Sequence, residues 1–227
     1  MKKIIPILFL FFICLFCYYI YNITEDDNPN ITMIGDNIAS NPYIIKNNQT
    51  DTSFINQDYH IKDLLDTIKY NEEITINDKS ISIHLKLKQA DILIISIGMN
   101  DIYYKLNENS KDIYTYMNNI INIYSEILEE ISKYDYKKVY VLGYYNIYDK
   151  YNDIFVYTNY KLKKITSKYN YTFIDLNNLF HNKTNYLKNN TNFSLNNNGY
   201  YQIFKFIVEK SKKSWYNIKR IYYYDLY

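Results

Sequence analysis

Short polar clusters follow four apolar runs of this 227-residue chain, and their residue types could bind a ligand or take part in a reaction. The clusters read Gly-Asp-Asn at 35–37, Gly-Met-Asn-Asp at 98–101, Gly-Tyr-Tyr-Asn at 143–146 and Asp-Leu-Asn-Asn at 175–178. Carboxylates accept hydrogen bonds or protons, and carboxamides both donate and accept. The chemistry of the protein is therefore expected immediately after these apolar runs.

The elements that must position these clusters alternate between strands and helices. An apolar run bounded by Asp and Gly, such as 91–98, is typical of a strand buried on both faces. Apolar residues at helical spacing, as in 110–133, predict an amphipathic helix. The expected elements are strands at 31–34, 91–98, 138–145 and 171–176, helices at 58–70, 110–133, 154–168 and 196–215, and a hairpin or irregular stretch at 74–87.

This alternation predicts the fold class and the location of the site. Strands and helices joined by short connections form a parallel sheet covered by helices on both faces, which is a three-layer α/β/α sandwich. Ligands of such sheets bind at the carboxyl ends of the strands. The four polar clusters are therefore expected to line one edge of a central parallel sheet.

Three of the motifs resemble those of a known family. Ile-Gly-Asp-Asn at 34–37, Ile-Ser-Ile-Gly-Met-Asn-Asp at 95–101 and Leu-Asn-Asn-Asn-Gly-Tyr-Tyr-Gln-Ile at 195–203 are similar, in order and spacing, to blocks of the SGNH hydrolases, or GDSL-type esterases and lipases. The resemblance covers about residues 31 to 211. It implies the flavodoxin-like α/β/α sandwich and acyl transfer through a serine, a histidine and an aspartate.

The residues that carry the reaction in this family are replaced at most matching positions. The nucleophile position is Asn37, whose carboxamide cannot form an acyl-enzyme. The base position is Ser194, and the position of the orienting acid is Thr191. A second-block glycine that helps to hold the oxyanion falls near Asp58, and Asn100 alone keeps its family role as an oxyanion donor.

The remaining residues of the motifs are expected to shape the binding site. Gly35 allows close backbone approach after the first strand, and Gly98 opens the third block. Asp36 and Asp101 are interpreted as turn residues, each bonding local backbone N–H groups. No metal site and no cofactor are expected.

Two functions remain open at this point. The first is a catalytically degenerate SGNH-type protein with a binding or scaffold role, taking a small acyl or sugar ligand in the former active site. The second is an active esterase or acylhydrolase with a rearranged site, in which His60 serves Ser40 or Ser194. Without such a rearrangement, His60 is expected on the exposed face of its helix.

The N-terminus predicts attachment to a membrane. Lys2 and Lys3 precede an apolar run at 4–21, which spans about 27 Å as a helix, close to the thickness of a bilayer core. No small residues mark a cleavage site, so residues 1–27 are expected to be an uncleaved anchor and linker. Residues 28–215 would then be an extracytoplasmic SGNH-like domain, followed by a tail at 216–227. Secretion after cleavage of a signal peptide is the alternative.

Composition excludes some partners. The net charge is +2, and no basic block of the kind that nucleic acid requires is present, so nucleic acid is not expected as a partner. The 30 tyrosines accompany abundant Asn, Ile and Lys, a composition typical of an AT-rich bacterial genome. Both cysteines lie in the apolar run, so the exported part must be stable without disulfides.

Overall fold

The structure is a computed structural model that describes residues 30–36, 54–55, 58–76, 79–107, 112–146, 149–188 and 194–210. Asn37, Ser40, Thr191 and the apolar run at 4–21 lie outside the described residues. Among the helices of these ranges, none is long and apolar enough to cross a membrane.

A five-stranded sheet forms the centre of the fold. Its strands lie in the order β2-β1-β5-β6-β7, and all four neighbouring pairs are parallel. Numbered along the chain, the order is 2-1-3-4-5, which is the flavodoxin-like arrangement. The predicted parallel sheet is therefore confirmed. The strands are β1 (Ile31–Gly35), β2 (Phe54–Ile55), β5 (Ile92–Ser96), β6 (Lys138–Leu142) and β7 (Thr172–Ile174).

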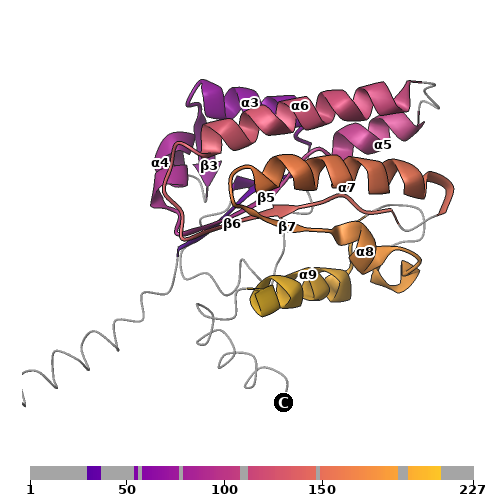
Figure 1. The fold of residues 1–227 in the computed structure, drawn as a ribbon. Coiled ribbons are helices and arrows are strands. Elements are labelled where there is room, and N and C mark those ends of the chain that lie inside the picture. The colour runs from indigo at the N-terminus through magenta and orange to yellow at the C-terminus, as the bar shows by residue number, and fades with distance from the viewer. Residues whose placement is uncertain are drawn as a thin grey trace, which may run out of the picture.

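Helices cover the sheet, as Figure 1 shows. Helices α3, α5, α6 and α7 lie on one side of the strands and α9 lies on the other side (Figure 1). The helices are α3 (Ile61–Lys69), α4 (Ile83–Gln89), α5 (Met99–Asn107), α6 (Ile113–Ile131), α7 (Asn152–Ser167), α8 (Leu176–Phe180) and α9 (Asn197–Lys210), with short 3₁₀ turns at Asp149–Tyr151 and Thr184–Tyr186.

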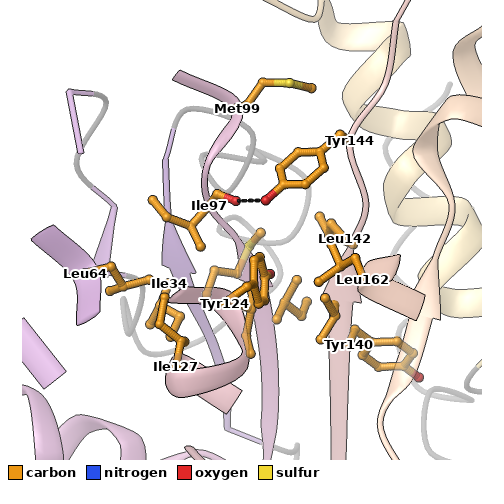
Figure 2. Close-up of a cluster of buried hydrophobic side chains, with 14 of the residues drawn as sticks. Ile34, Leu64, Ile97, Met99, Tyr124, Ile127, Tyr140, Leu142, Tyr144 and Leu162 are labelled. Carbon is orange, nitrogen blue, oxygen red and sulfur yellow. Dashed lines mark hydrogen bonds between the residues drawn. The ribbon is translucent and has the colours of Figure 1, made fainter. Parts of the chain in front are cut away.

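The core forms where the buried strands meet the apolar stripe of α6. All five residues of β5 are buried, as the continuous apolar run predicted. Tyr124 and Ile127 of α6 pack among Ile34 of β1 and Leu64 of α3 (Figure 2). Burial of large side chains on both sides of β5 fixes the position of its carboxyl end, where the site residues begin.

The structure differs from the expected elements at four places. The stretch at 74–87 is a hairpin, β3 (Glu73–Ile76) with β4 (Lys79–Ser82), but it continues directly into α4. The Ser82 hydroxyl accepts a hydrogen bond from Leu85 N, which caps that helix. The third block, expected to be a loop, forms the first turn of α5. Strand β2 and helix α8 were not expected, because two and five residues give little periodicity.

Asparagine replaces glycine at several helix ends. Asn71, Asn170 and Asn182 follow the ends of α3, α7 and α8 with φ between 51° and 58°. Asparagine tolerates this left-handed conformation better than other residues with a side chain. The chain has only four glycines, so this use of asparagine explains how its helices end without them.

Candidate functional site

Gly35 brings the carboxyl ends of β1 and β5 unusually close together. Its φ is +136°, and a Cβ at this position would lie 1.7 Å from the carbonyl oxygen of Ser96. Any side chain would therefore collide with the neighbouring backbone. The two strand ends that carry the first and third family blocks are joined here.

Asp36 extends this junction. Its backbone N–H donates to Ser96 O at 2.8 Å, and its Oδ2 accepts from the N–H of Met99 at 3.0 Å. The side chain is fully buried. Local bonding therefore does not describe Asp36 fully, because its carboxylate also bonds the start of α5 and ties the first block to the third.

Asp101 is also more than a local turn residue. It lies in the first turn of α5, where its Oδ2 accepts a hydrogen bond from Ile61 N at 2.9 Å. Its Oδ1 lies 3.2 Å from Nδ1 of His60. Burial raises the pKa of the Asp101 carboxyl, while the Ile61 N–H and His60 oppose that shift. The local interpretation is therefore incomplete, because the carboxylate bonds the backbone of Asp101 itself and also two partners about forty residues away in sequence.

His60 occupies the position before the first residue of α3 and faces Asp101. Its backbone N–H donates to Asp63 Oδ2 at 2.9 Å, and its side chain is 50% exposed. His60 is exposed, as expected, but it lies at the start of α3 and not on the outer face of the helix. The sequence did not predict the contact between His60 and Asp101, because the two residues are far apart in the chain and only the fold brings α3 and α5 together.

Asn100 connects the second and third blocks. Its Nδ2 donates to the carbonyl oxygen of Tyr59 at 3.0 Å. Asp58, at the position of the family glycine, directly precedes Tyr59 and is exposed. The structure thus places Asn100 beside the segment that the sequence assigned to the second block.

Ser194 lies at the entrance to α9. Its carbonyl oxygen accepts from Lys188 N at 2.8 Å, and Leu195 forms an isolated bridge with Leu187. Asn196 Oδ1 accepts from Gly199 N at 3.0 Å, which fixes the first turn of the helix. Among the described residues, no hydrogen bond links Ser194 with Asn100, and the proximity of Ser194 to the other blocks stays a prediction.

The two remaining clusters, at 143–146 and 175–178, are held by side-chain amides. Asn159 Oδ1 accepts from Tyr144 N, and its Nδ2 donates to Tyr144 O and to Asp175 Oδ1, at 2.8 to 2.9 Å. Asn177 Oδ1 accepts from Asn146 N at 2.9 Å. These amides satisfy buried backbone groups at the ends of β6 and β7, which is a structural role.

Tyr144 closes the base of the third block. Its hydroxyl donates to Ile97 O at 3.0 Å (Figure 2), and a Cβ on Gly98 would lie 2.7 Å from that hydroxyl. Burial raises the pKa of Tyr144 well above its ordinary value, and the negative charges of Asp36 and Asp101 contribute. Tyr144 therefore stays a neutral hydrogen-bond donor and positions the chain just before α5.

Polar side chains lie together at the carboxyl edge of the sheet, and two of them, His60 and Asp101, form a contact between ionisable groups. Asp36 follows β1, Asn100 and Asp101 lie in the first turn of α5, and His60, just before α3, contacts Asp101. Within the described ranges, no three His, Cys, Asp or Glu side chains are placed to hold a metal ion.

Comparison with known proteins supports the fold. No family model and no curated protein matches the sequence. Among solved structures, a lipase from a goat rumen metagenome, Lip_vut3, is similar with a TM-score of 0.59 and 16% identity, over 75% of this chain and 91% of that chain. This chain therefore has a fold similar to that of the lipase. At such identity, the likeness shows the fold alone.

Two acetylxylan esterases share the same architecture. Axe2 from Geobacillus stearothermophilus has a TM-score of 0.56 and 13% identity, over 80% of this chain and 93% of that chain. The acetyl xylan esterase AlAXEase has a TM-score of 0.52 and 17% identity, over 81% and 98%. The chain thus spans nearly the whole length of known esterase structures.

Proposed function

We propose that this chain is a divergent SGNH-type protein that binds a small acyl or sugar ligand at the carboxyl edge of its sheet and no longer forms the acyl-enzyme of the family. We further propose that residues 4–21 attach it to the cell membrane, with the domain outside the cytoplasm. In this proposal, the protein binds its acyl or sugar ligand at the position of the former active site.

One observation carries the proposal. Side-chain hydrogen bonds join the polar clusters at this edge, because Asp36 bonds Met99 N and Asn100 bonds Tyr59 O. The positions that would react are Asn37, Ser194 and Thr191. A joined polar edge without a nucleophile fits binding better than acyl transfer, since a carboxamide cannot be activated as a serine hydroxyl is.

The ligand class follows from the groups at the edge and from the similar folds. Carboxamides such as Asn100 donate hydrogen bonds to carbonyl and hydroxyl oxygens, which acetylated sugars present together. Two of the similar structures are esterases that act on acetylated xylan. An acetylated oligosaccharide is therefore the first ligand to test.

Binding can be measured by titration calorimetry with the full chain in detergent. Acetylated xylotriose should bind saturably, and unmodified xylotriose should bind more weakly. Asn100→Ala should weaken binding by about tenfold, the equivalent of one lost hydrogen bond. His84→Gln is the matched control, because α4 precedes β5 and lies at the opposite edge of the sheet. The absence of saturable binding to either sugar would refute the proposal.

The loss of acyl transfer can be tested separately with a fluorophosphonate probe, which labels activated serines. The unmodified protein and Asn37→Ser should both stay unlabelled. Asn37→Ser combined with Ser194→His and Thr191→Asp should gain weak labelling, because it restores nucleophile, base and orienting acid. The missing oxyanion donor near Asp58 limits the gain, by roughly 10²- to 10³-fold. Rapid labelling of the unmodified chain would contradict the proposal.

A second candidate is an active esterase with a rearranged site. The contact between His60 Nδ1 and Asp101 Oδ1 favours it, because a histidine oriented by a carboxylate is the arrangement of a general base.

A further inference from the structure

We infer that His60 and Asp101 form a base dyad that activates a water molecule toward an ester bound at the carboxyl edge of the sheet, so that water attacks the ester directly and no acyl-enzyme forms. The inference rests on the proposed binding of an acyl ligand at this edge. It differs from the chemistry of the serine positions because the base comes from the start of α3 and the nucleophile is water.

The carboxylate holds the imidazole by one nitrogen. Asp101 Oδ1 lies 3.2 Å from His60 Nδ1, and an ionised carboxylate can only accept. The neutral ring therefore carries its proton on Nδ1 and a lone pair on Nε2. Nε2 is the ring nitrogen that does not face Asp101, and in the proposed step it is the atom that takes a proton from water.

Asp101 is itself fixed in place. Its side chain is 9% exposed, and its Oδ2 accepts the Ile61 N–H at 2.9 Å. The carboxylate cannot rotate without leaving that N–H unsatisfied. The exposed half of the dyad is His60, at 50%, so one member is anchored in the protein and the other faces solvent. A fixed carboxylate beside a solvent-facing imidazole suits proton transfer between His60 and a bound water molecule.

The dyad lies beside the polar groups of the proposed ligand site. Asp101 directly follows Asn100, whose Nδ2 bonds the carbonyl of Tyr59, and Tyr59 directly precedes His60. The charged groups that contact His60 are Asp101 on α5 and Asp63 on α3, which bonds the His60 backbone N–H, and Asp58 precedes His60 by two residues in the chain. The side chains that contact His60 in this way are therefore carboxylates.

The step balances without any further reactant. His60 Nε2 takes one proton from water as the water oxygen bonds to the acyl carbon, and the carbonyl π electrons move to its oxygen. The tetrahedral intermediate then re-forms the carbonyl and expels the sugar oxygen, which takes the proton from Nε2. One ester and one water give one carboxylic acid and one alcohol, and His60 returns to its neutral form.

The test is acetate release from acetylated xylotriose by the full chain in detergent. His60→Ala should lower the rate by about 10²- to 10⁴-fold, the usual contribution of a general base. Added imidazole should restore part of the activity of His60→Ala above the rate of imidazole alone, which a purely structural role would not allow. His84→Gln should leave the rate unchanged. Failure of imidazole rescue, or a rate insensitive to His60→Ala, would overturn the inference.

A second variant tests the positioning role of Asp101. Asp101→Asn keeps an oxygen for the Ile61 N–H but removes the charge that orients the imidazole, so it should lower kcat more than it raises KM. Mass spectrometry during turnover should show no acylated protein. A covalent acyl adduct would overturn the inference, while saturable binding without hydrolysis would refute it and leave the proposed function standing.

Discussion

The carboxylate of Asp36 at the end of β1 accepts a hydrogen bond from the backbone N–H of Met99, 3.0 Å away and 63 residues later in the chain. Met99 is the first residue of α5, and this N–H has no partner within its own helix. One buried side chain thus satisfies the helix start that presents Asn100 and Asp101.

Replacing Asp36 should therefore destabilise the protein. Asp36→Ala leaves the Met99 N–H buried without an acceptor, which costs about 1–3 kcal/mol in the free energy of unfolding. Asp36→Asn keeps an oxygen at the same place and should cost less. Urea unfolding followed by circular dichroism measures both. Equal stability of wild type and Asp36→Ala would show that the bond contributes nothing.

Gly35→Ala should be more damaging than Gly143→Ala. At Gly35 the new Cβ would meet the Ser96 backbone at 1.7 Å with φ at +136°, and backbone cannot move aside without breaking the sheet. At Gly143 the nearest atom, 2.6 Å away, is the tip of the Phe173 side chain, which can rotate. Gly35→Ala is expected to fold poorly or to melt well below Gly143→Ala in a thermal scan. Similar melting temperatures would contradict the close approach of β1 and β5.

Asp91 should stabilise the fold at neutral pH and lose that effect in acid. Burial tends to raise the pKa of its carboxyl, but hydrogen bonds from the Lys137 ammonium and the Asn30 N–H outweigh it and lower the pKa below 3.8. A lowered folded pKa stabilises the protein above the unfolded value, and the effect disappears as pH falls through the folded value. Asp91→Asn should cost about 1 kcal/mol at pH 7. Its difference from wild type should shrink below about pH 4, and a constant difference would count against the ion pair.

Asp101 should show the opposite dependence. Burial raises its pKa above 3.8 despite the Ile61 N–H and His60, so the folded state binds the proton more tightly than the unfolded state. Stability contributed by the protonated form is present at low pH and is lost as pH rises through the raised pKa. Asp101→Asn should gain stability relative to wild type between about pH 4 and neutrality. A relative loss over that window, in parallel urea titrations, would mean that the pair with His60 dominates.

Residues 4–21 should retain the full-length protein in membranes. Their length and apolarity suffice for one helical span, so alkaline carbonate should not extract the protein from a membrane fraction. A variant lacking 4–21 is the matched control and should be released. A mature protein that starts between residues 22 and 30 would instead show a cleaved signal peptide.

Much of the fold could be predicted from local pattern. The apolar run at 91–98 and the helical stripe at 110–133 are long and regular, so they identified β5 and α6 correctly. The parallel pairing of β5 with β6 followed from the alternation of elements. Short elements such as β2 escaped prediction because two residues carry no periodicity, and their position depends on pairing with β1.

The sequence by itself also located the polar clusters after the strands and showed, by residue type, that Asn37 cannot act as a nucleophile. It could not show the partners of Asp36, Asp101 and His60. Those bonds join residues forty to sixty positions apart, and each carboxylate could equally have capped its own turn. Only the tertiary structure decided between these partners, because packing of the sheet and α3 against α5 buries the carboxylates beside distant N–H groups that have no other acceptor.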